Sequence, residues 1–272
     1  MNILITGAKG MVGRALVNNL KNIRDGKNRT RPNISIGEIY EYDVDSTTEQ
    51  LDEYCEKAEF VFNLAGVNRP KDPKEFMEGN FGFANELIKA LKKHNNKAPI
   101  MLSSSIQATL SGRFANSEYG ISKKAGEELF YKYSEEEGVS VFVYRFPNLM
   151  GRSRPNYNSA VSTFCWAIAN DKEYTVNDRS VQLELLYIDD LIEGMLDNDI
   201  VNFFANMYIG FSGEVEETTT EEPTVITTTE APTTVVTTKT PDTGDTSAVF
   251  AAIATLTVAS AAAFVCLKKK ED

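Results

Sequence analysis

The chain opens with NILITGAKGMVG at residues 2–13, and this stretch decides the fold. Residues 2–5 are a short apolar run typical of a buried strand, and apolar residues at helical spacing follow from position 15 onward. In a strand, turn and helix of this kind, Gly7 supplies the backbone angles of the turn, and Gly10 lets the main chain approach a pyrophosphate. Gly13 lets the helix pack closely on the strand, with its N-terminus facing the phosphates. The stretch predicts a dinucleotide-binding turn whose cofactor contacts are Gly7, Gly10, Met11, Val12 and Gly13.

The rest of the first 210 residues alternates strand-like and helix-like runs, which indicates an α/β fold. We expect a Rossmann-type, doubly wound parallel sheet with a small substrate lobe. The sequence has 272 residues, of which 42% are hydrophobic, so the chain is long enough to bury a sizeable core. Shifts of composition predict a nucleotide-binding domain at 1–210, a Thr/Pro/Glu-rich stalk at 211–246, a transmembrane helix at 247–267 and a charged tail at 268–272.

The segment after residue 210 differs in composition from a globular domain. Residues 214–240 contain 12 Thr and six Glu and no aromatic residue. Such a segment cannot bury enough apolar surface to offset its chain entropy, so we expect a disordered stalk. Residues 247–267 are uncharged, and about 20 residues rising ~1.5 Å each match the ~30 Å hydrocarbon layer of a membrane. We therefore expect one transmembrane helix.

The order of these tail segments resembles a Gram-positive cell-wall sorting signal, in which a sortase cuts between a threonine and a glycine. Pro241-Asp242-Thr243-Gly244 precedes the apolar span, and three lysines follow it. The first residues, however, form a strand rather than the signal peptide of an exported protein. We expect a single-pass membrane protein with its catalytic domain in the cytoplasm, and the alternative is a cell-wall or surface location.

Charge, cysteine and histidine counts disfavour several kinds of function. The formal net charge is −11, which argues against a nucleic-acid-binding surface. The three cysteines, Cys55, Cys165 and Cys266, lack the spacing of metal ligands, so we expect neither a disulfide framework nor a metal site. The single histidine, His94, lies in a polar run typical of a solvated helix end. Hydrolase triads that use histidine are therefore disfavoured.

A second motif supplies the chemistry. Residues 99–105 form a strand-like run that ends in three serines, and Tyr119 and Lys123 follow, four residues apart on one face of a helix. Hydride transfer to a ketone leaves negative charge on oxygen, which Tyr119 would protonate. Lys123 would lower the pKa of that tyrosine and bind the nicotinamide ribose, while Ser105 would donate a hydrogen bond to the carbonyl oxygen. We expect Ser105, Tyr119 and Lys123 to be the catalytic residues.

The choice of dinucleotide is open from the residues alone. The second strand is expected at residues 38–42, and Asp43 follows at its end. This aspartate either holds a ribose 2′-hydroxyl and favours NAD, or it contacts adenine. Arg29 and Arg31 either meet a 2′-phosphate, which favours NADP, or belong to a solvated loop.

Residues 1 to about 200 resemble the extended short-chain dehydrogenase/reductases, also called the NAD-dependent epimerase/dehydratase family. The matching pieces are residues 6–13, 63–66, Asn80, the serine strand, residues 119–123, residues 144–148 and residues 187–190. The resemblance implies cofactor contacts at Leu64, Ala65, Gly66 and Pro147, alongside Asp43, Tyr119 and Lys123.

A closer resemblance is to capsular polysaccharide enzymes that reduce UDP-2-acetamido-2,6-dideoxy-hexos-4-ulose. Residues 65–70, 102–109, 154–159 and 176–179 carry it. It implies NADPH as the cofactor, with NADH less favoured, and a UDP-linked keto sugar as the substrate. A diphosphate suits arginine forks and hydrogen-bonding amides. The implied substrate contacts are Ser104, Ser105, Asn148, Arg154, Asn156, Tyr157 and Arg179.

The residues also narrow the reaction within this family. Sugar 4,6-dehydratases carry an Asp-Glu pair directly after the catalytic serine or threonine, and Ile106 and Gln107 stand in that place. We therefore expect an oxidoreductase that reduces the C4 keto group. One alternative is a UDP-sugar 4-epimerase with tightly bound NAD, and another is a wall- or membrane-anchored protein carrying an inactive or fused nucleotide-sugar domain. The expected partners are a UDP-linked keto sugar, a second copy of the chain, the membrane and a sortase, with no nucleic acid.

Overall fold

The computed structural model describes residues 1–32, 34–153, 159–176 and 183–197, and its main sheet has five parallel strands in the order β2-β1-β3-β4-β5. The strands are β1 (Ile3–Thr6), β2 (Ile39–Tyr42), β3 (Phe60–Asn63), β4 (Ile100–Ser105) and β5 (Val141–Phe146). The chain adds β2 on one side of β1 and β3 on the other, so the strand order reverses between β1 and β3. In doubly wound sheets, ligands bind at the carboxyl ends of the strands at such a point.

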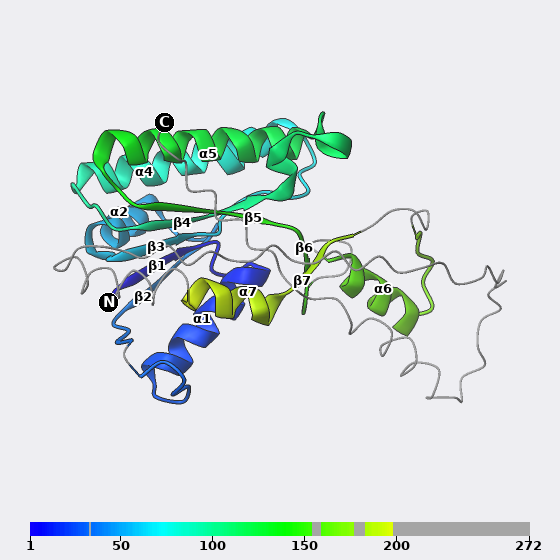
Figure 1. The fold of residues 1–272 in the computed structure, drawn as a ribbon, viewed down its shortest axis with the longest axis horizontal. Helices are drawn as coiled ribbons and strands as arrows, with labels where there is room; N and C mark the ends of the chain where they lie inside the picture. Colours follow the sequence, from blue (N-terminus) through cyan, green and yellow to red (C-terminus); the bar gives the residue numbers. More distant parts are fainter. Residues whose placement is uncertain (33, 154–158, 177–182, 198–272) are drawn as a thin grey trace, which may run out of the picture. The chain divides into compact units, whose positions relative to one another are not determined.

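Helices cover both faces of this sheet (Figure 1). On one face lie α1 (Met11–Arg24) and α7 (Ile188–Met195), and on the other lie α2 (Thr48–Lys57), α4 (Phe83–Lys93) and α5 (Glu118–Glu137). All residues of β1, β3 and β4 are buried. Strands covered on both faces need apolar side chains on both, which explains the uninterrupted apolar runs at 3–5 and 60–62.

Shorter elements complete the described residues. They are α3 (Lys74–Phe76), a π-helical turn (Met77–Gly82), two 3-10 turns (Ile106–Thr109 and Gly112–Phe114) and α6 (Ala160–Ala169). A separate two-stranded parallel sheet pairs β6 (Asn148–Met150) with β7 (Leu185–Tyr187). This small sheet and α6, which contacts β6, are the part of the predicted substrate lobe that the structure describes.

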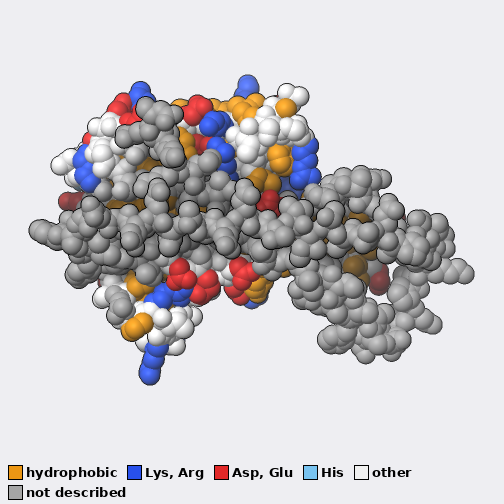
Figure 2. Space-filling model, in the orientation of Figure 1, with side chains coloured by type: hydrophobic (Ala, Val, Ile, Leu, Met, Phe, Trp, Pro, Cys, Tyr) orange, Lys and Arg blue, Asp and Glu red, His pale blue; other side chains and the backbone are white. Residues whose placement is uncertain are grey.

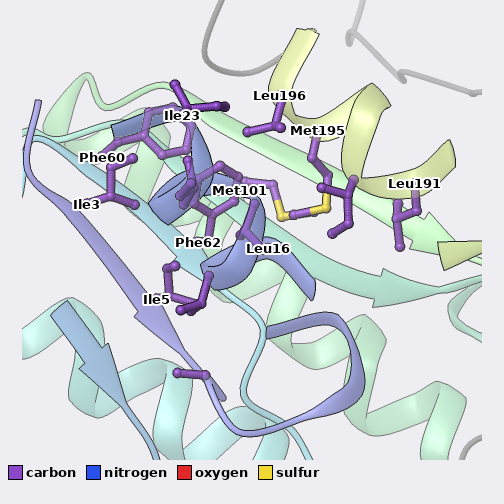
Figure 3. Close-up of a cluster of buried hydrophobic side chains, with 14 of the residues drawn as sticks. Ile3, Ile5, Leu16, Ile23, Phe60, Phe62, Met101, Leu191, Met195 and Leu196 are labelled. Atoms are coloured by element: carbon purple, nitrogen blue, oxygen red, sulfur yellow. The ribbon is translucent and has the colours of Figure 1, made fainter. Parts of the chain in front are cut away.

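Two apolar clusters, one on each face of the sheet, form the core. The cluster on the α1 face is completed by α7 and the residue after it, where Leu191, Met195 and Leu196 are fully buried. Figure 3 shows these side chains among the cluster that includes Leu16 of α1 and Met101 of β4. The end of the described chain therefore packs back onto its beginning.

Ion pairs reinforce this contact at the surface. The Arg31 guanidinium lies 2.5 Å from the Glu193 carboxylate and 2.7 Å from the Asp197 carboxylate. Figure 2 shows acidic and basic side chains together where α1 and α7 lie. The pairs hold the loop after α1 against α7.

The predicted α/β class and the doubly wound parallel sheet are confirmed. The second strand begins at Ile39, one residue later than expected. The predicted stalk, transmembrane helix and charged tail lie outside the described residues. Among the helices that the structure describes, none is both long and apolar enough to cross a bilayer.

Candidate active site

The predicted glycine turn lies between β1 and α1. Gly7 has a φ of +68°, a left-handed conformation that favours glycine, and its carbonyl oxygen accepts the Gly10 N–H at 2.9 Å. A Cβ at Gly13 would overlap that same carbonyl oxygen, so glycine is what lets α1 pack this closely. The N-terminus of α1 has neither a side-chain cap nor an acidic residue in its first turn. Its first N–H groups are therefore left to an anion such as a pyrophosphate.

A large cavity opens at this turn, with a volume of about 1590 Å³. The turn, the ends of β2, β3 and β4, and α5 all contribute to its wall. Every predicted site residue that the structure describes lines it: Gly7, Gly10, Met11, Val12, Gly13, Asp43, Leu64, Ala65, Gly66, Ser104, Ser105, Tyr119, Lys123, Pro147 and Asn148. Four predicted substrate contacts, Arg154, Asn156, Tyr157 and Arg179, lie outside the described residues.

Ser105, Tyr119 and Lys123 converge in this cavity from the end of β4 and the first two turns of α5. The Ser105 hydroxyl hydrogen-bonds with the Tyr119 phenol, and its oxygen also accepts the Gln107 N–H at 3.2 Å. The Lys123 ammonium donates to the Ser103 carbonyl oxygen at 3.1 Å and lies 5.8 Å from the centre of the Tyr119 ring. An acid, a hydrogen-bond donor and a cation placed together in this way can deliver a proton to a carbonyl oxygen.

Burial sets the protonation states of two of these groups. Burial raises the pKa of Tyr119 to about 12, and the hydrogen bond with Ser105 opposes that rise. Burial lowers the pKa of Lys123 to about 8, and the charge of Glu127 opposes that fall. The expected lowering of the Tyr119 pKa by Lys123 is not found, because desolvation dominates. At neutral pH Tyr119 keeps its proton, as a general acid must.

A hydrogen-bond network fixes the loop after β3 against the cavity. The Thr6 hydroxyl donates to Asn63 Oδ1 at 2.6 Å and accepts the Ala65 N–H at 3.2 Å. A Cβ at Gly66 would lie 2.9 Å from Lys123 Nζ. The small residues of this loop therefore let the backbone pass directly over the catalytic lysine.

Asn80 supports the same loop from the π-helical turn, a kind of element found frequently at functional sites. Its Oδ1 accepts the Val67 N–H at 3.0 Å, and its Nδ2 donates to Ser122 Oγ at 2.9 Å. Asn80 thereby joins the loop to α5 beside Lys123.

Asp43 follows β2 and lines the cavity where Rossmann folds place the adenosine ribose. Its carboxylate accepts the Lys9 N–H at 2.7 Å. Neither arginine considered for a 2′-phosphate lines the cavity: Arg31 pairs with the α7 region, and Arg29 donates to a carbonyl of its own loop. Arg14 of α1 does line it, a cation that the sequence analysis missed although it directly follows the glycine pattern.

Ser104 has a partner inside the protein. Its residue lines the cavity, but its side chain is buried and its hydroxyl donates to Glu127 Oε1 at 2.6 Å, so its contact with substrate stays a prediction. Glu127 was also missed, although its place four residues after Lys123 puts both on one face of α5.

Comparison with known proteins agrees with this geometry. The sequence matches the NAD dependent epimerase/dehydratase family over residues 3–197. It is 39% identical over 193 residues to the UDP-2-acetamido-2,6-beta-L-arabino-hexul-4-ose reductase of Pseudomonas aeruginosa, covering 71% of this chain and 48% of that protein. It is also 39% identical to the capsular polysaccharide assembling protein CapF from Staphylococcus aureus, with a TM-score of 0.59 over 79% of this chain and 52% of that one. The chain thus spans about half the length of these relatives.

A more distant structure, the UDP-glucuronic acid 4-epimerase from Bacillus cereus in complex with NAD, is 21% identical with a TM-score of 0.58 over 73% of each chain. That likeness shows the fold alone. The matched residues 3–197 contain the glycine turn, the cavity and the Ser-Tyr-Lys cluster. Sequence, fold and site agree, and the chain belongs to the NAD-dependent epimerase/dehydratase family.

Proposed function

We propose that this protein reduces the C4 keto group of a UDP-linked 4-keto-6-deoxy amino sugar, with NADPH or NADH as the hydride donor. The observation that carries the proposal is the convergence of Ser105, Tyr119 and Lys123 in one cavity with the glycine turn. The 39% identity to a reductase named for a UDP-linked hexul-4-ose supports the substrate class.

The cavity fits a nicotinamide dinucleotide. The bound cofactor would supply a hydride to the keto carbon. The uncapped N-terminus of α1 would bind the pyrophosphate, and the small side chains of Ala65 and Gly66 leave the backbone close to the reacting centre. The Lys123 ammonium would donate hydrogen bonds to the nicotinamide ribose.

The protein's own contribution to the reaction is the delivery of a proton. When the hydride forms a C–H bond, the electron pair of the carbonyl π bond moves onto oxygen, and the proton of the Tyr119 hydroxyl passes to that oxygen. Ser105 would donate a hydrogen bond to the same oxygen and keep it in place. The charge of Lys123 then stabilises the tyrosinate until it is reprotonated from solvent.

The residues after Ser105 argue for reduction over dehydration. Loss of water across C5 and C6 needs a further acid and a further base. Ile106 cannot titrate, and the Gln107 side-chain carbonyl is occupied, since it accepts the Ser117 hydroxyl at 2.7 Å. Among the described residues, the site therefore has a proton donor for the keto oxygen, and the two positions after Ser105 do not supply the pair that dehydration needs.

The preference for NADPH over NADH is part of the same proposal. Arg14 supports it, because this guanidinium lines the cavity and would attract a 2′-phosphate. The charge of Asp43 opposes it, because this carboxylate lines the same cavity. The balance between these two charges sets the preference.

The test uses the purified full chain, a UDP-linked 4-keto-6-deoxy amino sugar and each reduced dinucleotide. We expect stoichiometric oxidation of the dinucleotide and a product that has gained one hydride and one proton. Interconversion of sugars with no net oxidation, together with NAD that survives purification, would assign a 4-epimerase instead. Binding of the dinucleotide or the sugar without turnover would assign an inactive nucleotide-sugar domain instead.

We also propose that residues 247–267 anchor the protein in a membrane, with the catalytic domain in the cytoplasm. The uncharged run between a Thr-rich segment and three lysines supports the anchor. Nucleotide sugars and NADPH are cytosolic, which supports the placement. Protease added to intact protoplasts tests it: protection of the chain agrees with this placement, and digestion of residues 214–240 would assign a surface location open to a sortase.

A further inference from the structure

A carboxylate that the proposed mechanism does not use lies directly behind the catalytic cluster. Glu127, on α5, is 0% exposed. Arg145 of β5 binds it with two hydrogen bonds, from Nε at 2.8 Å and from its terminal nitrogen at 2.6 Å. Ser104 of β4 donates a third at 2.6 Å, and the Lys124 ammonium lies 3.7 Å from Glu127 Oε2. Isolated buried carboxylates are costly, so this one is retained by a complete set of donors.

Glu127 stands next to both catalytic elements. It lies one helical turn after Lys123 on the same face of α5. Its partner Ser104 immediately precedes Ser105 on β4. One buried carboxylate therefore contacts the strand that carries the catalytic serine and shares a helix face with the catalytic lysine.

We propose that Glu127 is a positioning residue for the reaction, whose buried charge keeps Lys123 protonated and whose hydrogen bonds fix the end of β4 that carries Ser105. The proposal rests on the proposed function, since it assigns Glu127 a part in that same site. The negative charge of Glu127 is what the test must isolate. An uncharged polar side chain at this position could still accept some of the same hydrogen bonds.

The surroundings of Lys123 make this charge matter. On its own helix Lys123 faces Tyr119 and Glu127, with Lys124 beside it. From β4 it meets the Ser103 carbonyl, and from the loop after β3 it meets Gly66; Asn80 of the π-helical turn lies against the same glycine, and none of these three is charged. From β5, Arg145 binds both oxygens of the Glu127 carboxylate. Burial favours loss of the Lys123 proton, and the negative charge of Glu127 opposes that loss.

The decisive experiment titrates Lys123 in the full chain, with lysine Cε labelled with carbon-13 and the Lys123 signal identified by its absence in Lys123→Met. Wild type should titrate with a midpoint near pH 8. Glu127→Gln keeps the side-chain shape and removes the charge, and its midpoint should fall by roughly one pH unit. Glu127→Asp keeps the charge, so its midpoint should lie closer to that of wild type.

Glu128→Gln is the matched control, because Glu128 is the next residue on the helix but is exposed. This variant should leave the Lys123 midpoint unchanged.

A folded Glu127→Gln protein with the wild-type midpoint would overturn the proposal. If the single variant does not fold, Glu127→Gln combined with Arg145→Met removes both charges and leaves neither unpaired. Its midpoint should still fall, since the charge of Glu127 opposes loss of the Lys123 proton, and an unchanged midpoint would again overturn the proposal.

A kinetic arm separates this inference from the proposed function. The alkaline limb of the reductase pH profile should move to lower pH in Glu127→Gln, in step with the lysine titration. A wild-type protein that consumes no dinucleotide would refute the reductase assignment, while the lysine titration would still decide whether Glu127 holds the charge on Lys123.

Discussion

The Lys123 ammonium lies 5.8 Å from the centre of the Tyr119 ring, one turn further along α5, and its hydrogen bond goes to the Ser103 carbonyl oxygen. At this distance the charge acts on the phenol through space rather than by direct contact. In the resting site the phenol keeps its proton, because burial raises the pKa of Tyr119. The lysine is therefore placed to stabilise the tyrosinate after the proton has left.

Tyr119→Phe should reduce reductase activity by about 10²–10⁴-fold, because it removes the hydroxyl that protonates the keto oxygen. Dinucleotide binding, measured by calorimetry, should stay within a few-fold of wild type, since the ring still fills its place against Phe76. Activity within a few-fold of wild type would show that another group delivers the proton.

Lys123→Met should abolish most activity yet raise stability at neutral pH. The pKa of Lys123 is about 8 in the folded protein and near its ordinary 10.5 when unfolded. The unfolded chain thus binds more protons between these values, and the penalty of the buried charge is fully present below pH 8 and disappears above 10.5. Removing the charge should add about 1–3 kcal/mol to the unfolding free energy at pH 7.

Denaturant unfolding of this variant and of wild type across that pH range checks the sign. The difference between the two proteins should shrink as the pH rises. A variant less stable than wild type at pH 7 would mean that the ammonium stabilises the fold through its bond to Ser103.

Gly13→Ala should weaken dinucleotide binding at least roughly tenfold and destabilise the protein by about 1–3 kcal/mol, because the new Cβ would overlap the backbone of the turn. Gly126→Ala is the matched control in another helix, where the nearest atom to a Cβ is 3.9 Å away. That change should stabilise the protein by about 0.5–1 kcal/mol through helix propensity. Thermal melts with and without dinucleotide measure the stability and the dinucleotide binding of each variant. Equal effects of Gly13→Ala and Gly126→Ala would contradict the close packing of the turn.

Asp43→Asn and Arg14→Gln should move the dinucleotide preference in opposite directions. The first removes a negative charge from the adenosine end while an amide oxygen can still accept the Lys9 N–H, so NADPH should gain roughly tenfold relative to NADH. Arg14→Gln removes the cation, so the affinity for NADPH relative to NADH should fall by a similar factor. Competition binding with both dinucleotides measures the ratio, and the assignment of this end of the cavity fails if neither change alters it.

The sequence was sufficient for the parts of the site that are local. The glycines of residues 7–13 and the pair Tyr119 and Lys123 each lie within one short segment, and the pair predicts its chemistry because it follows the glycine turn and a strand that ends in serines. Their convergence follows from the rule that parallel strands end at the same edge of a sheet.

The parts that depend on distant contacts were not predictable. Arg31 was considered for a phosphate, but its partners are distant in the sequence. Glu193, for example, lies 162 residues further along the chain. The hydrogen bond from the Ser104 hydroxyl to Glu127 could not be predicted, because it depends on how α5 packs on β4. The pKa of Tyr119 depends on how deeply the ring is buried, and burial is a property of the assembled fold.

The packing of α7 on α1 has a consequence for biosynthesis. A nascent chain that has emerged only as far as β7 already carries the glycine turn and the Ser-Tyr-Lys cluster, but the outer apolar side of α1 still lacks the side chains that cover it. Closing so long a loop carries an entropic cost, and the exposed surface invites aggregation or chaperone binding in the meantime. Ribosome-stalled chains that end just before and just after α7 should therefore differ sharply in protease resistance, because the last helix of the described chain completes the environment of the first.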